Sequence, residues 1–259
     1  MKFPIWQVDA FTNRRLAGNP AAVIPLETWL ADDVLLAIAA ENNLSETAFL
    51  VREAGDWRIR WFTPKLEVKL CGHATLASAH VLFTHLEPQR TSVTFASRSG
   101  PLVVTREGAR IVLDFPAYPC ERIETPPLLV EALGATPVET WLGTKMMAVF
   151  AHESDVAALR PDFAKIARIE AFGVVATAPG DRSDIASRNF IPQAGIDEDP
   201  VTGAAHCQLT PYWARRLGKP HLHARQISRR GGELWCEDRG ERVRLAGEAV
   251  EYLSGTIEI

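Results

Sequence analysis

The feature that most constrains this chain is an internal repeat whose two copies lie half a chain apart. The first copy reads Arg60-Trp61-Phe62-Thr63-Pro64 followed by Cys71-Gly72-His73-Ala74-Thr75. The second copy reads Arg188-Asn189-Phe190-Ile191-Pro192 followed by Thr202-Gly203-Ala204-Ala205-His206. In each copy an apolar strand ends at a proline, and a glycine then opens a helix of small residues. This spacing favours duplication of a whole domain over a short solenoid repeat.

A length of 259 residues leaves room for two domains of moderate size. Hydrophobic residues make up 47% of the chain and charged residues 23%, which is typical of globular proteins that bury a core. Prolines at 116 and 119 indicate a crossover between the halves. We therefore expect an N-terminal half over residues 1–116 and a C-terminal pseudo-repeat over residues 117–259.

The charge pattern favours a small-molecule partner over a polymer or a membrane. A net charge of −4 gives no long-range attraction for nucleic acid or anionic lipid. The sequence contains neither a secretory signal nor an apolar run of membrane-spanning length, so we expect a cytoplasmic location. The four cysteines are widely spaced, which favours reduced thiols over disulfides.

Apolar alternation and turn residues predict mixed, mostly antiparallel strands with two helices in each half. The expected strands cover residues 3–10, 21–25, 47–52, 57–62, 93–95, 102–106, 111–115, 139–151, 173–178 and 186–190, followed by terminal strands. The expected helices cover residues 32–40, 73–86, 128–133, 163–169 and 203–217. The order of elements is similar in the two halves, which places the chain in the α+β class.

The sequence carries no standard motif for a nucleotide, a phosphate loop or a serine nucleophile. Possible metal ligands occur in three places, at Cys71 and His73, at His206 and Cys207, and at His221 and His223. None of these pairs has the spacing of a common zinc site, and neighbouring helical residues point about 100° apart. We therefore expect neither a metal nor a cofactor.

Glu46 stands at the start of a strand that is apolar on both faces. It could be an exposed and inert carboxylate at a helix-to-strand turn. A buried position would instead raise its pKa through desolvation, which suits a general acid/base at neutral pH. The second half has Val174 at the matching place, so a catalytic Glu46 would make the site a one-carboxylate site.

Three further residues have both a structural and a functional interpretation. His73 could cap a helix, or it could donate a hydrogen bond to substrate or relay a proton. Asp199 could complement a helix dipole, although the following proline fixes it in an extended conformation. Cys71 lies beside a helix N-terminus, where a thiolate is stabilised. The second copy has Thr202 at that place, whereas a two-thiol racemase needs a thiol on each face of the substrate carbon.

Taken together, these segments resemble the PhzF family of phenazine-biosynthesis-like isomerases over essentially the whole chain. The resemblance rests on Gln7-Val8-Asp9-Ala10-Phe11-Thr12, Gly18-Asn19-Pro20-Ala21-Ala22-Val23, Leu44-Ser45-Glu46-Thr47-Ala48-Phe49, the first repeat copy, and Glu198-Asp199-Pro200-Val201 together with residues 202–206, which follow it. The resemblance implies a diaminopimelate-epimerase-like fold, in which each pseudo-symmetric half wraps a curved sheet around a central helix. It also implies that residues 253–259 cross back to the first half, and that the protein forms a homodimer.

The resemblance also implies roles for particular residues. Glu46 matches the family's general acid/base, and His73 and Asp199 match substrate-contacting residues that assist proton movement. Asn19 joins the substrate-binding set, and the helix starts at Gly72 and at Gly203 and Ala204 would offer backbone amides to a carboxylate. Where the family commonly has serine, this chain has Ala204, which removes a hydroxyl contact and makes the phenazine-pathway substrate doubtful.

We therefore predict a cofactor-independent isomerase that moves a proton on a small, carboxylated and unsaturated metabolite. An amino-acid racemase or epimerase on the same fold is the second hypothesis, and the missing second thiol argues against it. A catalytically silent scaffold that binds a small ligand is the third. The joint presence of Glu46, His73 and Asp199 favours chemistry.

Overall fold

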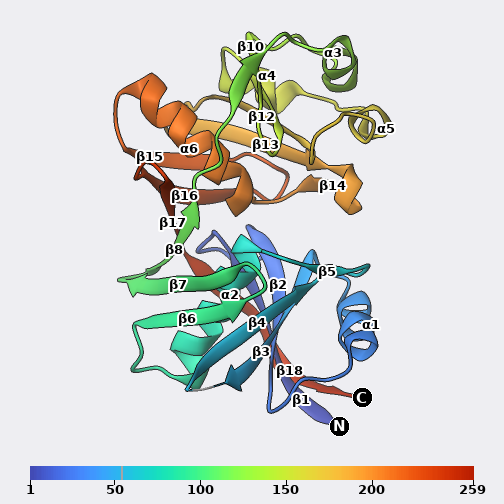
Figure 1. Ribbon diagram of the computed structural model, residues 1–259, viewed down its shortest axis with the longest axis vertical. Helices are drawn as coiled ribbons and strands as arrows, with labels where there is room; N and C mark the ends of the chain where they lie inside the picture. Colours follow the sequence, from blue (N-terminus) through green and yellow to red (C-terminus); the bar gives the residue numbers. More distant parts are fainter. Residues whose placement is uncertain (54) are drawn as a thin grey trace. The chain divides into compact units, whose positions relative to one another are not determined.

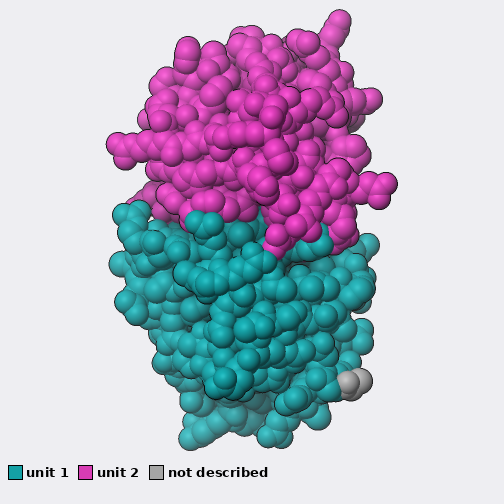
Figure 2. All heavy atoms as spheres, turned by 90° about the vertical axis from the view of Figure 1, so that its left-hand side faces the viewer, with its two compact units in different colours: residues 1–114, 245–259 teal, residues 115–244 magenta. Residues whose placement is uncertain are grey.

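The computed structural model describes residues 1–53 and 55–259, which form the two compact units coloured in Figure 2. Unit 1 contains residues 1–114 and 245–259, and unit 2 contains residues 115–244. The last strand, β18 (Ala249–Glu258), pairs antiparallel with the first, β1 (Lys2–Ala10). Unit 1 is therefore assembled from both ends of the chain, whereas unit 2 is one continuous segment.

Unit 1 is a mixed sheet with helices packed against it (Figure 1). Its other strands are β2 (Asn19–Leu26), β3 (Glu46–Glu53), β4 (Asp56–Phe62), β5 (Glu67–Val68), β6 (Ser92–Ser97) and β7 (Gly100–Glu107). The strand β8 (Arg110–Pro116) begins in unit 1 and ends in unit 2. The helices of unit 1 are α1 (Asp32–Asn42) and α2 (Gly72–Val81), and α2 continues into the π-helical turn η1 (Leu82–Leu86). The helix expected over residues 73–86 is therefore α-helical at first and π-helical in its last turn.

Unit 2 repeats this plan with more helices. Its strands are β9 (Glu121–Ile123), β10 (Glu139–Leu142), β11 (Met146–Val149), β12 (Val174–Pro179), β13 (Ile185–Ile191), β14 (Ile196–Asp199), β15 (His221–Gln226) and β16 (Gly232–Asp238). The strand β17 (Arg242–Gly247) begins in unit 2 and ends in unit 1. The helices of unit 2 are α3 (Pro127–Leu133), α4 (Glu153–Ala158), α5 (Phe163–Ile166), the 3-10 turn η2 (Pro192–Ala194) and α6 (Gly203–Leu217). The helices expected near 128–133, 163–169 and 203–217 correspond to α3, α5 and α6, whereas α4 and η2 exceed the two helices expected for each half. The strands expected over 139–151 form the antiparallel hairpin of β10 and β11.

The strands of the two units pair in the same order and with the same directions. In unit 1, β2 is parallel to β3, β3 is antiparallel to β4, and β4 is parallel to β6. In unit 2, β11 is parallel to β12, β12 is antiparallel to β13, and β13 is parallel to β15. Short strands add to the same place in each sheet, β5 beside β4 and β14 beside β13. The sequence repeat therefore has a structural counterpart in the sheet topology.

The repeated arginine makes the same contacts in both units. Arg60 donates from Nε and Nη2 to the two carboxylate oxygens of Glu67, at 2.8 Å each. Arg188 donates in the same way to Glu198, at 2.7 and 2.8 Å. Each guanidinium also lies 5.0 Å from the ring centre of the phenylalanine two residues later. A bidentate, ring-stacked arginine fixes the short strand to its neighbour, which explains why the repeat retains this residue pair.

A helix made mostly of small and apolar residues lies at the centre of unit 1. In α2 every residue from His73 to Ala79 is buried, and the helix contacts β1, β2 and β3. A helix that is apolar on all sides is stable only when protein surrounds it. The corresponding helix of unit 2, α6, is buried from Ala205 to Thr210 and contacts β15 and β16. Both helices begin at the glycines that the repeat indicated.

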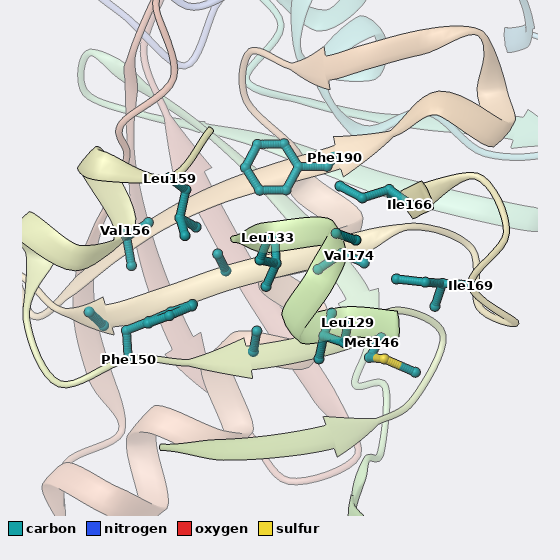
Figure 3. Close-up of a cluster of buried hydrophobic side chains, with 14 residues drawn as sticks. Leu129, Leu133, Met146, Phe150, Val156, Leu159, Ile166, Ile169, Val174 and Phe190 are labelled. Atoms are coloured by element: carbon teal, nitrogen blue, oxygen red, sulfur yellow. The ribbon is translucent and has the colours of Figure 1, made fainter. Parts of the chain in front are cut away.

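The remaining helices cover separate hydrophobic clusters. In unit 1, Leu35 and Ile38 of α1 pack with Ile24, Phe49 and Phe62 of the sheet. In unit 2, side chains from α3, α4 and α5 converge on β11, β12 and β13, as Figure 3 shows around Phe190, Leu133 and Val174. In both units, the sheet face under these helices is therefore covered by apolar side chains. Among the described residues, no helix is both long and apolar enough to cross a membrane.

Candidate active site

In unit 1 the fold brings together Glu46, Cys71 and His73 although β4 and β5 separate them in sequence. Glu46 is the first residue of β3, and His73 is the second residue of α2. Cys71 is the N-cap residue of that helix, with an extended backbone at φ −142°. The three side chains offer ligand atoms that all lie within 4.8 Å of one another. The predicted residues Glu46 and His73 are thus direct neighbours.

His73 lies between Glu46 and Asn19. Its Nε2 is 3.1 Å from Glu46 Oε2, and its Nδ1 is 3.2 Å from Asn19 Nδ2 and 3.5 Å from Cys71 Sγ. A charged ring, and a neutral ring with its proton on Nε2, both direct an Nε2–H donor at the carboxylate. The Asn19 side chain is fully buried, while 14% of the Glu46 side chain remains exposed. A solvent-accessible carboxylate therefore has a buried and oriented imidazole behind it.

The electrostatics of this cluster separate the roles of the thiol and the imidazole. Burial raises the pKa of the Cys71 thiol to about 11, and the Glu46 carboxylate adds to the rise. Burial also opposes a charged His73, but Cys71 and the Glu46 carboxylate outweigh it and hold the pKa of His73 well above its usual value. The helix N-terminus could stabilise a thiolate, but desolvation and the neighbouring negative charge dominate, which supports the prediction that Cys71 does not act as an acid or base.

A carboxylate, a thiol and an imidazole at these distances are also ligand types for a divalent metal. Thiol ligation requires loss of the thiol proton, and the raised pKa of Cys71 opposes that loss. In addition, Nδ1 of His73 is in contact with Asn19 and Cys71. The expectation that the site works without a metal stays a prediction, which metal analysis of the purified protein would check.

Asp199 lies in unit 2 at the end of β14, immediately before the start of α6. Its side chain is buried, and Thr202 Oγ1 donates a hydrogen bond to Asp199 Oδ2. Thr202 is the N-cap residue of α6, so it is the structural counterpart of Cys71. A hydroxyl donor favours the ionised form of a carboxylate. Asp199 is therefore oriented by the turn that opens the second central helix.

Gln226, which the sequence analysis did not identify, holds this turn in place. Its Nε2 donates to the Asp199 carbonyl at 2.6 Å and to Thr202 Oγ1 at 3.3 Å. Its Oε1 accepts from the Thr202 backbone N–H at 2.9 Å. Gln226 is fully buried at the end of β15, beside Ser187 of β13. Only the three-dimensional pairing of β13 with β15 connects it to Asp199, so no local sequence signal could indicate it.

Lys145 is a second residue that the sequence analysis did not identify. It immediately precedes β11, the counterpart of β2, whose first residue is Asn19. Only 3% of Lys145 is exposed, and its Nζ donates to the Phe172 carbonyl at 3.0 Å. Burial lowers the pKa of Lys145 to about 8, and the charge of Asp199 opposes part of that shift. The correspondence between β11 and β2 is the signal that could have indicated this lysine.

Replacing Lys145 with methionine should stabilise unit 2 in neutral solution. The folded-state pKa of about 8 lies below the ordinary value of 10.5, so the unfolded state binds more protons between these pH values. The resulting destabilisation is fully present below pH 8 and disappears as the pH rises to 10.5, and its size corresponds to about 3 kcal/mol. Urea unfolding at a series of pH values should show that Lys145→Met has a higher free energy of unfolding than the wild type, and that this difference shrinks between pH 8 and pH 10.5. A gain independent of pH would contradict the assigned cause.

The predicted amide donors occupy the starts of the two central helices. Gly72 and Gly203 are the first residues of α2 and α6. Ala204 follows with an exposed side chain, so a serine there would present its hydroxyl to solvent. The first backbone N–H groups of a helix have no partner within the helix and can bind an anion. Substrate binding by Asn19, Gly72, Gly203 and Ala204 stays a prediction.

Comparison with known proteins gives the same family over nearly the whole chain. The model of the phenazine biosynthesis-like protein family, PhzC-PhzF, matches residues 8–255. An uncharacterized isomerase of Pseudomonas aeruginosa is 54% identical over 261 residues, covering 100% of both chains. A crystal structure of a PhzF-family protein from Enterococcus faecalis is 45% identical, has a TM-score of 0.98 and also covers 100% of both chains.

A more distant structure shows the same fold. A hydroxyproline epimerase from Agrobacterium vitis has a TM-score of 0.63 at 11% identity, covering 99% of this chain and 91% of the epimerase. This likeness confirms the expected epimerase-like α+β fold, with a curved sheet around a central helix in each half. The chain belongs to the phenazine biosynthesis-like, or PhzF, family and is an isomerase of that family.

Proposed function

We propose that this PhzF-family isomerase moves a proton between carbon atoms of a small, carboxylated and unsaturated metabolite, with Glu46 as the general acid/base. The observation that carries the proposal is the placement of Glu46, whose Oε2 lies 3.1 Å from Nε2 of the buried His73. A carboxylate can remove a proton from a carbon next to a conjugated system and return it elsewhere on that system. The proposed mechanism needs no cofactor.

The surroundings of Glu46 support this division of labour. His73 is held through Nδ1 by Asn19 and Cys71, so its Nε2 stays directed at the carboxylate. A histidine with a raised pKa can donate a proton or a hydrogen bond to negative charge that develops on the substrate. We assign to Asp199 and Lys145 the binding of polar substrate groups, because both are buried and their charges interact. The expected homodimer stays a prediction.

A panel of unsaturated carboxylic acids tests the proposal. Compounds that raise the melting temperature of the wild-type protein are incubated with it in deuterated water, and the products are identified by NMR. We expect a shifted double bond or a keto–enol change in at least one compound, with deuterium at the reprotonated carbon unless Glu46 returns the original proton. Inversion of a stereocentre alone would favour the racemase hypothesis. Binding without any conversion would favour a silent scaffold.

Cys71→Ala should retain most of the isomerase activity. The two central helices have Cys71 and Thr202 at their N-caps, so unit 2 supplies no second thiol at the matching position. The raised pKa of Cys71 also makes it a poor base near neutral pH. Turnover by Cys71→Ala is compared with that by Cys207→Ala, which removes another buried thiol. A loss of several orders of magnitude in the folded Cys71 variant alone would restore the racemase hypothesis.

A further inference from the structure

Unit 2 contains a cavity that the proposed isomerase chemistry does not use. Its volume is about 360 Å³, and it lies between the C-terminal half of α6, the β9–β10 strand pair and the segment before β9. The lining residues are Tyr118, Pro119, Cys120, Arg122, Glu139, Trp141, Pro211, Tyr212, Arg215 and Arg216. Asp199 and Thr202 precede the first turn of α6, whereas the cavity is next to its last two turns. It is therefore separate from the Asp199 turn.

The cavity carries excess positive charge on a chain whose net charge is −4. Its single lining carboxylate, Glu139, is already fully engaged. Glu139 Oε1 accepts from Arg216 Nη1 at 2.7 Å, and Oε2 accepts from Trp141 Nε1 at 2.9 Å and from the Tyr212 hydroxyl at 3.1 Å. Neither Arg122 nor Arg215 pairs with a carboxylate in residues 1–53 and 55–259. Two guanidinium groups therefore remain available to an anion.

The same contacts fix the aromatic walls. Glu139 binds the polar atoms of both Trp141 and Tyr212, and these rings meet edge to face with centres 5.3 Å apart. Arg122 lies directly opposite Trp141 in the β9–β10 pair, so the cation and the indole are cross-strand neighbours. Arg215 of α6 and Cys120 of the segment before β9 both line the cavity. The cavity lining thus combines cationic and aromatic groups.

Pro211 explains how the segment before β9, which also lines the cavity, is attached to α6. A proline inside a helix has no N–H, so the carbonyl four residues earlier loses its helical partner. That carbonyl belongs to Cys207, and it accepts instead from the backbone N–H of Tyr118 at 3.0 Å. Gly143 packs so closely below this segment that an added Cβ would lie 2.8 Å from the Pro119 carbonyl oxygen. The cavity wall is therefore held by specific contacts of this sequence.

We propose that this cavity is a second ligand site, which binds a small aromatic carboxylate. Arg122 and Arg215 bind the carboxylate, and the ring of the ligand stacks on Trp141 or Tyr212. Guanidinium groups bind planar carboxylates through paired hydrogen bonds. Rigid aromatic walls favour a flat ring over a compact anion such as phosphate. The volume lies at the lower end of the range for small-molecule sites, which suits a ligand of one or two rings.

Binding of 2-naphthoate to the full chain tests the site. Isothermal titration is performed at constant ionic strength with 2-naphthoate, its uncharged carboxamide, its saturated decalin analogue and inorganic phosphate. We expect 2-naphthoate to bind, and we expect each of the other three probes to bind more weakly. Arg122→Gln and Arg215→Gln should each lower the affinity for 2-naphthoate by about tenfold, which corresponds to the loss of one charge-assisted hydrogen bond.

Two control variants make the result specific. Arg168→Gln removes an exposed arginine of the same unit outside the cavity, and it should leave the affinity unchanged. Glu46→Gln should also leave it unchanged, since Glu46 belongs to unit 1 and not to this cavity. Absence of 2-naphthoate binding at millimolar concentration would overturn the proposal. Equal binding of phosphate, or equal affinity in the two cavity variants, would also overturn it.

Discussion

Glu46→Gln is expected to bind the substrate and to convert it on the order of 10²–10⁴ times more slowly than the wild type, or slower where no other base substitutes. Glutamine keeps the length and shape of the side chain, and its amide can still approach His73 Nε2. It cannot accept a proton from carbon. Single-turnover and steady-state rates with a substrate from the panel, together with its dissociation constant, separate loss of chemistry from loss of binding.

The matched control for this variant is Glu41→Gln. Glu41 is an exposed carboxylate on α1 of the same unit, and its replacement changes the net charge by the same amount. We expect its rate to equal that of the wild type. A folded Glu46→Gln protein that turns over substrate at nearly the wild-type rate would make Glu46 a structural residue, and the proposed mechanism would then be wrong.

Phe190→Ala is expected to destabilise the protein by about 3–5 kcal/mol, the usual cost of removing a large aromatic side chain from a packed core. Phe190 is fully buried in the cluster of Figure 3, where Ile166, Leu159 and Val174 surround it. The Arg188 guanidinium also lies 5.0 Å from its ring centre. Truncation would therefore remove a stacking partner of the arginine that binds Glu198. Urea-induced unfolding measures the change.

Val138→Ala provides the comparison, because 55% of Val138 is exposed in the same unit. Val138→Ala should change the free energy of unfolding by no more than about 0.5 kcal/mol. Phe190→Leu fills much of the space and should fall between the two. If Phe190→Ala unfolds at nearly the wild-type urea concentration with an unchanged slope, the Phe190 cluster does not contribute to the stability of unit 2.

Much of the fold could be predicted because the repeat carries strong local signals. A glycine that opens a run of small residues marks the start of each central helix, and α2 and α6 begin at Gly72 and Gly203. Glu46 was expected at the start of a strand, and it is the first residue of β3. Elements with a clear apolar period and defined ends are those that local sequence describes best.

The elements that were missed are short and depend on tertiary contacts. Helix α4 has six residues and is held by a capping box between His152 and Asp155. Strand β14 has the acidic sequence from Ile196 to Asp199, which lacks strand-like composition. It forms because Arg188 of the adjacent β13 binds Glu198 through two hydrogen bonds. Such pairing energy comes from a partner strand, so propensity alone underestimates it.

The candidate site residues likewise include some that local sequence could predict and some that it could not. A sequence can place Glu46, His73 and Asp199 on motifs, but it cannot give the desolvation that sets their chemistry. Cys71 has a raised pKa because it is buried beside Glu46, and its position near a helix start alone could not show this. Lys145 and Gln226 come near Asp199 only because the fold of unit 2 joins distant segments. Burial and long-range pairing are thus the properties that local patterns do not contain.

The split composition of unit 1 has a consequence for synthesis on the ribosome. All of unit 2 is translated before residues 245–259, which complete unit 1. Until then β1 lacks its partner β18 and has an unpaired edge along its length. Unit 2, which is translated later than most of unit 1, can therefore form its sheet before unit 1 receives its final strand. Domains usually fold from the N-terminus onward during translation, whereas here the N-terminal unit receives its last strand only after the C-terminal unit has been translated in full.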